Sequence, residues 1–201
     1  MSELLTFLHL GFRHITDLAA LDHILFLSAL AAIYRGREWR DLLWVISAFT
    51  IGHSITLALA VTSALRLPTS LIEFLIPVTI LATGLENIVV RRRKRAPLGG
   101  GYRPVFAGIF GLVHGAGFAN YLQSLFTGSI VVPLLGFNVG IELGQLVVLA
   151  AAGATLAAVD RLLAWLRPPG ARPSAYRLRV LAVSALVIVI ATRMAAARAP
   201  W

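Results

Sequence analysis

The sequence predicts an all-α membrane protein, a bundle of six transmembrane helices that forms one polytopic domain over residues 1–201. Hydrophobic residues make up 58% of the chain and the mean hydropathy is +0.83, whereas soluble domains are about 45–50% apolar. Several stretches of about 18 residues or more carry few charges, which is the pattern of a membrane-spanning helix. Basic residues gather in alternate gaps between these stretches, as the positive-inside rule predicts for a multi-pass protein.

The predicted spans cover, in chain order, residues 16–34, 42–65, 70–90, 105–126, 130–160 and 178–194. A basic gap at residues 35–40 ends the first span, and the turn Arg66-Leu67-Pro68 separates the second from the third. The linkers RRRKRAPLGGGYRP and RPPGARPS, both rich in helix-breaking residues, follow the third and the fifth. Residues 4–12 are suited to a short interfacial helix that leads into the first span.

The net charge of +9 and the pI of about 11.4 reflect this topology rather than a nucleic-acid partner, because no basic surface with interleaved aromatic residues is available. The basic gaps follow spans one, three and five. These gaps are therefore predicted to face the cytoplasm, and both termini the outside, of a bacterial inner membrane. The lipid bilayer, with its anionic head groups, is the expected partner. The chain has no cysteine, which excludes disulfides and thiolate metal ligands.

Ionisable residues inside the predicted spans point to a buried polar site. They are Asp22, His23, His53, His114 and Glu142. Each would cost several kcal/mol in hydrocarbon unless it faced the protein interior or water. The rise of a helix puts His53 and His114 near the membrane midplane and the other three at similar depth or slightly outside it. Any single histidine here is as often a structural hydrogen-bonding residue as a ligand, but the set of five predicts one site.

Uncharged polar residues lie near these ionisable residues in the sequence. Asn138 and Gln145 are spaced with Glu142 at i, i+4 and i+7, so the three side chains share one face of the fifth span. Thr50 belongs to a polar face of the second span, and Asn120 lies further along the fourth. We expect Thr50, Asn120, Asn138 and Gln145 to support the ligands or to line a path to them.

Imidazole and carboxylate groups without thiolates suit borderline divalent ions such as nickel, cobalt and zinc. Asp22 and His23 are about 100° apart on a helix, so both could flank one ion, or one could orient the other. In contrast, His9 and His14 lie near the outer surface, where solvation is the favoured interpretation. Glu86 lies near the cytoplasmic end of the third span and is more readily explained by that position than as a ligand.

Five segments carry a further pattern, in this order: GFRHITDLAALDHILFLSAL, AFTIGHSITLALA, LIEFLIPVTI, FGLVHGAGFANYL and GFNVGIELGQLVV. Together they resemble the HupE/UreJ family of membrane proteins, from about Gly11 to Val148. Members of this family are associated with hydrogenase and urease gene clusters and are regarded as nickel or cobalt permeases. By position, the resemblance points to the same five residues as metal ligands: Asp22, His23, His53, His114 and Glu142.

One position departs from the family pattern. Some members have a histidine six residues before the aspartate of the Asp-His pair, where this chain has Thr16. The nearest histidine is His14, which precedes Asp22 by eight residues and would lie about 12 Å from it along a continuous helix. His14 can therefore join the site only if the helix is broken between them. The departure weakens the inference of nickel more than that of a metal.

The leading hypothesis is a permease for a divalent transition-metal ion, nickel or cobalt by resemblance. One alternative is an intramembrane zinc hydrolase with Glu142 as its base. Another is a non-catalytic metal-binding or haem-binding subunit, with His53 and His114 as axial haem ligands. The chain has no G-x-x-x-x-G-K-[ST] loop, so ATP-driven transport by this chain alone is not expected. The sequence leaves the direction of transport, its energy source and homo-oligomer formation open.

Overall fold

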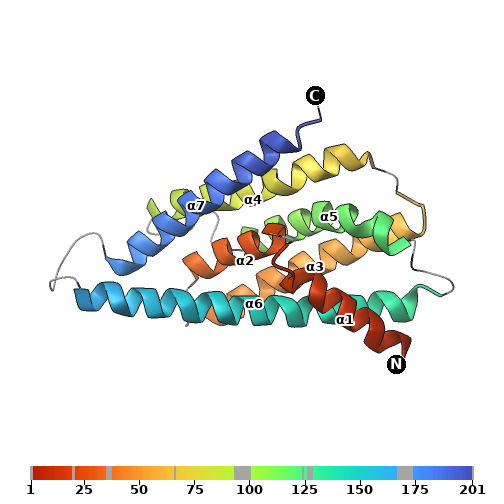
Figure 1. The fold of residues 1–201 in the computed structure, drawn as a ribbon, viewed down its shortest axis with the longest axis horizontal. Coiled ribbons are helices and arrows are strands. Elements are labelled where there is room, and N and C mark those ends of the chain that lie inside the picture. Colours follow the sequence, from red (N-terminus) through yellow and green to blue (C-terminus); the bar gives the residue numbers. More distant parts are fainter. Residues whose placement is uncertain are drawn as a thin grey trace.

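The computed structural model describes residues 2–19, 21–34, 38–65, 67–92, 101–123, 125, 129–166 and 174–200, and these contain seven α-helices and no strand. The helices are α1 (Glu3–Thr16), α2 (Leu21–Ile33), α3 (Trp39–Val61), α4 (Thr69–Arg92), α5 (Tyr102–Gln123), α6 (Val131–Leu166) and α7 (Ala175–Ala197). Most of them run lengthwise through the molecule, whereas α1 is inclined to the others (Figure 1). The predicted all-α class is confirmed. The predicted basic loops at 35–37, 93–100 and 167–173 and the turn residue Arg66 lie outside the described residues.

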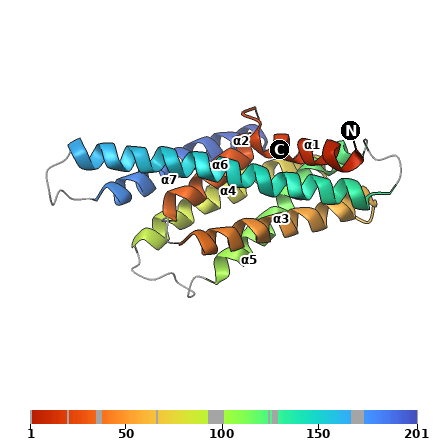
Figure 2. The same cartoon turned by 90° about the horizontal axis from the view of Figure 1, so that it is seen from below.

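The short helix α2 is the most enclosed element. It is apolar around almost its whole circumference, which is the pattern of a helix surrounded by others. Nine of its 13 residues are buried, and α4, α6 and α7 contact it (Figure 2). Its two ionisable residues, Asp22 and His23, both lie in the first turn. At the start of α2, His23 is buried in the bundle, whereas Leu21 is exposed and Asp22 is partly exposed.

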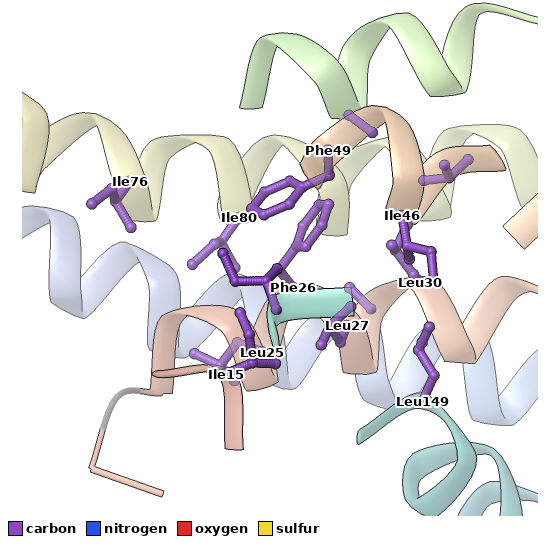
Figure 3. Packing of buried hydrophobic residues seen from close by; sticks show 14 of the residues in the cluster. Ile15, Leu25, Phe26, Leu27, Leu30, Ile46, Phe49, Ile76, Ile80 and Leu149 are labelled. Atoms are coloured by element: carbon purple, nitrogen blue, oxygen red, sulfur yellow. The ribbon is translucent and has the colours of Figure 1, made fainter. Parts of the chain in front are cut away.

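The apolar core around this turn joins α2 to α3. The rings of Phe26 and Phe49 stack with their centroids 5.0 Å apart and an interplanar angle of 29° (Figure 3). Ile15 of α1 and Ile80 of α4 belong to the same core, and both have an exposed fraction of 0%. Phe49 also meets the ring of His23 edge-on. This packing holds the beginning of α2 against the middle of α3.

Two helix pairs approach closely because glycines remove the intervening side chains. In the α1–α6 pair, a Cβ atom on Gly11 would overlap the backbone carbonyl of Phe137. In the α3–α5 pair, a Cβ atom on Gly115 would overlap the carbonyl of His53 in the same way. Small residues at a helix contact let the two backbones touch, and such packing is a principal source of helix association in membranes. The helices that carry the histidines are thus held at fixed, short separations.

Four helices are long and apolar enough to cross a membrane by length and composition, namely α3, α4, α6 and α7. They correspond to the predicted spans 42–65, 70–90, 130–160 and 178–194. The fourth predicted span, 105–126, corresponds to α5, which is not among them. Taking α1 and α2 as one bent span gives five candidates. The prediction of six spans is therefore not confirmed, whereas a multi-pass membrane protein is supported by these helices.

The first predicted span, 16–34, is not one continuous helix. The axes of α1 and α2 are bent by 68° relative to each other. Asp17 ends α1, because its N–H still bonds to the carbonyl of Arg13 while its Oδ1 accepts the N–H of Ala19 at 2.9 Å. Aspartate favours such turns, since its short side chain replaces a backbone hydrogen-bond partner. The predicted interfacial helix at 4–12 is instead part of α1, which lies against α6.

Candidate metal centre

Three histidines from three helices meet beside the break between α1 and α2. One ring nitrogen each of His14, His23 and His53 lies within 4.8 Å of the other two. The ring centroids are 4.6 Å apart for His14 and His23, 6.0 Å for His14 and His53, and 6.4 Å for His23 and His53. Two nitrogen ligands of one tetrahedral ion lie about 3.3 Å apart. Modest rotation of the rings would therefore produce a three-nitrogen site, which we call the histidine group.

A fourth histidine, His114 of α5, lies against the histidine group, with its ring centroid 5.3 Å from that of His23. Its Nε2 is 3.0 Å from the hydroxyl oxygen of Thr79 on α4. That hydroxyl donates its single hydrogen to the carbonyl of Ile76 at 2.7 Å, so the Nε2–H of His114 is the donor to Thr79. The Nδ1 atom of His114 therefore keeps its lone pair, which is the form that a metal ligand requires.

Six ring nitrogens of these four histidines are buried and lack hydrogen-bond partners among the described residues. This holds for both ring nitrogens of His23 and of His53, for Nε2 of His14 and for Nδ1 of His114. A buried polar atom without a partner costs about 1–3 kcal/mol and is rare in folded proteins. Six such atoms in one place indicate a ligand rather than ordinary packing. Neutral imidazole nitrogens fit a borderline divalent transition metal.

Phenyl rings surround the histidine group. The ring of His14 lies over Phe118 with a centroid distance of 4.0 Å. His53 lies between Phe49 and Phe137, each with a centroid distance of 6.2 Å. These contacts restrict rotation of the imidazoles and give the site a low local dielectric. Electrostatic interactions inside the site are strengthened as a result.

The two predicted carboxylates lie outside the histidine group. Asp22 pairs with Arg198, whose Nη1 is 3.3 Å from each carboxylate oxygen. Glu142 is half-buried on α6, the helix that lies against α1 and α2, but its carboxylate is not part of the group of three nitrogens. Of the five predicted ligands, His23 and His53 belong to the histidine group, His114 lies against it, and neither carboxylate is part of it.

The predicted supporting residues lie mainly between α3 and α6. The hydroxyl of Thr50 lies 3.1 Å from Oε1 of Gln145, and both side chains are buried. Asn138 directly follows Phe137, and its buried Oδ1 has no partner among the described residues. The Thr50–Gln145 contact joins α6 to α3 one turn before His53. The side chain of Asn120 lies outside the described part of the chain.

Sequence reasoning missed two residues of this site, His14 and Thr79. His14 was expected to be solvated, but the break after α1 places it inside the histidine group. Asp17, a turn-favouring residue between two helical stretches, was the available signal. Thr79 carried no signal, because a threonine in a helix ordinarily bonds to its own backbone and gives no sign of a distant partner.

Glu86 is engaged elsewhere, at the contact between α4 and α5. Arg103 donates to both of its oxygens, at 2.9 and 3.0 Å, and the hydroxyl of Tyr102 donates to it as well. These three side chains border a largely apolar pocket that Phe26 also lines. Because its charge is balanced by Arg103, Glu86 is explained as a residue that ties two helix ends together.

Replacing Thr79 by valine tests the positioning of His114. We expect the metal affinity to fall about tenfold to 100-fold, because the partner that orients a metal-binding imidazole has effects of that size. The free energy of unfolding should fall by about 1–3 kcal/mol, since the Nε2–H of His114 loses its acceptor. Thr155→Val is the matched control, because Thr155 is exposed and its hydroxyl donates to the carbonyl of Ala151 on its own helix. Equal metal affinities of the two variants, measured by titration calorimetry, would contradict the assigned role.

Comparison with known proteins gives one family match. A family model described as HupE / UreJ protein matches residues 1–197, which include all seven helices and all four histidines of the site. No curated protein and no solved structure gives a match. The matched range extends beyond the segments 11–148 on which the resemblance rests.

Proposed function

The chain belongs to the HupE/UreJ family, and we propose that it is a permease that carries a divalent transition-metal ion across the bacterial inner membrane. The family suggests a role in membrane metal transport. Nickel or cobalt is the expected cargo by resemblance, and neutral imidazole ligands without thiolates suit both ions as well as zinc. We place both termini outside the cytoplasm, because the basic gaps then face the inner side.

The observation that carries this proposal is the histidine group itself. Three helices each supply one imidazole to a point inside a membrane protein, where polar atoms are retained mainly for function. The helix break after Asp17 matters here, because it lets His14 of α1 and His23 of α2 meet. Broken helices beside buried polar groups are a recurring feature of ion-transport sites.

A transported ion needs charge compensation as well as neutral ligands. Two positive charges in a medium of low dielectric are costly unless an anion lies near. We assign this role to Asp22, which directly precedes His23, and to Glu142, which lies on the helix that packs against α1 and α2. Thr50, Gln145 and Asn138 would then support the path along α3 and α6.

Flux through the protein in sealed vesicles tests the proposal. Purified wild type in proteoliposomes should take up nickel or cobalt faster than empty vesicles, and His14→Ala should lose at least about 90% of that uptake, since one of three ligands is gone. His9→Ala is the matched control on the same helix, because His9 is exposed and lies outside the group. Uptake that is unchanged in His14→Ala would refute a permease that works through this group.

The three-nitrogen arrangement also matches the ligand set of catalytic zinc sites, which leave a fourth position for water. An intramembrane zinc hydrolase is therefore the second candidate. It predicts a metal that stays bound through purification and exchanges slowly, whereas a permease predicts rapid exchange during flux. A non-catalytic haem-binding subunit predicts a red preparation with a Soret band, so a colourless preparation excludes that variant.

A further inference from the structure

Arg198 holds the carboxylate that directly precedes a member of the histidine group. It follows the last residue of α7, and its Nη1 lies 3.3 Å from both oxygens of Asp22 in the first turn of α2. The Asp22 side chain is only 18% exposed, and that of Arg198 is 34% exposed. Asp22 and His23 are neighbours in the first turn of α2, so this ion pair lies one residue along the chain from a member of the histidine group.

The pair has an electrostatic consequence for any cation in the histidine group. Imidazoles are neutral as ligands, so they leave both charges of a divalent ion uncompensated. The carboxylate adjacent in the chain to His23 is that of Asp22, but in the pair its charge is balanced by the guanidinium. An incoming cation and Arg198 therefore compete for one carboxylate. Binding must also remain weak enough for the ion to leave again in transport.

We propose that Arg198 is an internal competitor of the transported cation: it neutralises Asp22 while the histidine group is empty, and the cation displaces it and recruits the Asp22 carboxylate. This inference rests on the proposed function. Arg198 is thus a residue that sets affinity through Asp22, without itself being a ligand. Its return to Asp22 would favour release of the ion.

Metal titration of the purified full-length protein with nickel chloride tests this role. Arg198→Gln should bind nickel about fivefold more tightly than wild type, because removing a partly exposed ion pair frees roughly 1 kcal/mol of interaction with Asp22. Asp22→Asn should bind about tenfold more weakly. In the Asp22→Asn background, Arg198→Gln should have no further effect. Arg193→Gln is the matched control, since Arg193 is exposed on the same helix.

A second variant keeps the fold constant while the charge is changed. The chain has no cysteine, so Arg198→Cys supplies a unique site for methanethiosulfonate reagents. A neutral reagent should leave nickel binding tight, and a cationic reagent on the same folded protein should weaken it about fivefold, as wild-type Arg198 does.

The outcomes separate the two proposals. If wild type binds nickel and Arg198→Gln binds it equally or more weakly, the role of Arg198 is overturned and the permease stands. If Arg198→Gln still tightens binding in the Asp22→Asn background, the arginine acts as a general positive charge, and competition for Asp22 is overturned. If wild type binds no nickel, cobalt or zinc, both proposals fall together.

Discussion

Replacing His53 by alanine should remove bound metal from the purified protein. His53 is completely buried on α3, and its two ring nitrogens have no partner among the described residues. It belongs to the group of three nitrogens and is held between Phe49 and Phe137. Losing one of three ligands should lower metal affinity by more than about 100-fold, because even changes outside the ligand set cost ten- to 100-fold.

The stability of the same variant gives an independent readout. Without metal, the cavity left by His53→Ala costs about 2–5 kcal/mol, but the variant is also relieved of two unpaired buried nitrogens at about 1–3 kcal/mol each. The thermal midpoint of the metal-free protein should therefore change little. Saturating nickel should raise the midpoint of wild type, since a ligand that binds only the folded state stabilises it. It should leave that of His53→Ala unchanged.

Elemental mass spectrometry of the protein in detergent measures the metal content, and thermal scanning measures the nickel-induced shift of the thermal midpoint. His9→Ala provides the control, because it removes an exposed histidine from α1 and should keep the metal content and the nickel-induced shift of wild type. A metal content near one ion per chain in His53→Ala would show that the ion is held elsewhere. That result would leave the buried histidines as structural residues.

Replacing Gly115 by leucine should disrupt the protein more than any change at the site itself. A Cβ atom at Gly115 would overlap the backbone carbonyl of His53, and backbone cannot move aside as a flexible side chain can. The α3–α5 contact must then separate, which displaces His53 and His114 together. Overpacking commonly costs about 1–3 kcal/mol, and a clash with backbone belongs at or above the upper end of that range.

Gly153→Leu is the matched control for this prediction. Gly153 lies on α6, and apart from neighbouring backbone of its own helix, no atom of the described residues lies within 4 Å of a Cβ built on it. This variant should be purified in wild-type yield, whereas Gly115→Leu should aggregate or elute as an expanded species in size-exclusion chromatography. If Gly115→Leu has the thermal midpoint of Gly153→Leu, the close approach of α3 and α5 is not required for the fold.

Much of the site could be predicted because an ionisable residue within an apolar segment is recognisable from that segment alone. His53 and His114 are ionisable residues in otherwise apolar helices, and that conflict with a lipid environment can be read from each segment alone. The spans of α3, α4, α6 and α7 could be predicted for the same reason, since hydropathy acts residue by residue. The order of the five segments identified the family before any geometry was known.

The parts that could not be predicted depend on distant contacts. His14 joins the histidine group because the chain turns after Asp17. Helical periodicity does not predict the angle of that turn. Asp22 pairs with Arg198, a residue 176 positions away, because α7 packs back onto α2. No local pattern tells which distant helix end will approach a given carboxylate.

The residues and their order alone thus identify an all-α membrane protein of the HupE/UreJ family that carries ionisable residues within apolar segments. The hydropathy of each segment and the distribution of basic residues between segments can both be read from the residues and their order. Only the folded chain brings ring nitrogens of His14, His23 and His53 within 4.8 Å of one another, places His114 against Thr79 and pairs Asp22 with Arg198. The physical reason is that these relations depend on helix packing, in which glycines such as Gly11 and Gly115 let particular backbones touch and so choose which side chains meet.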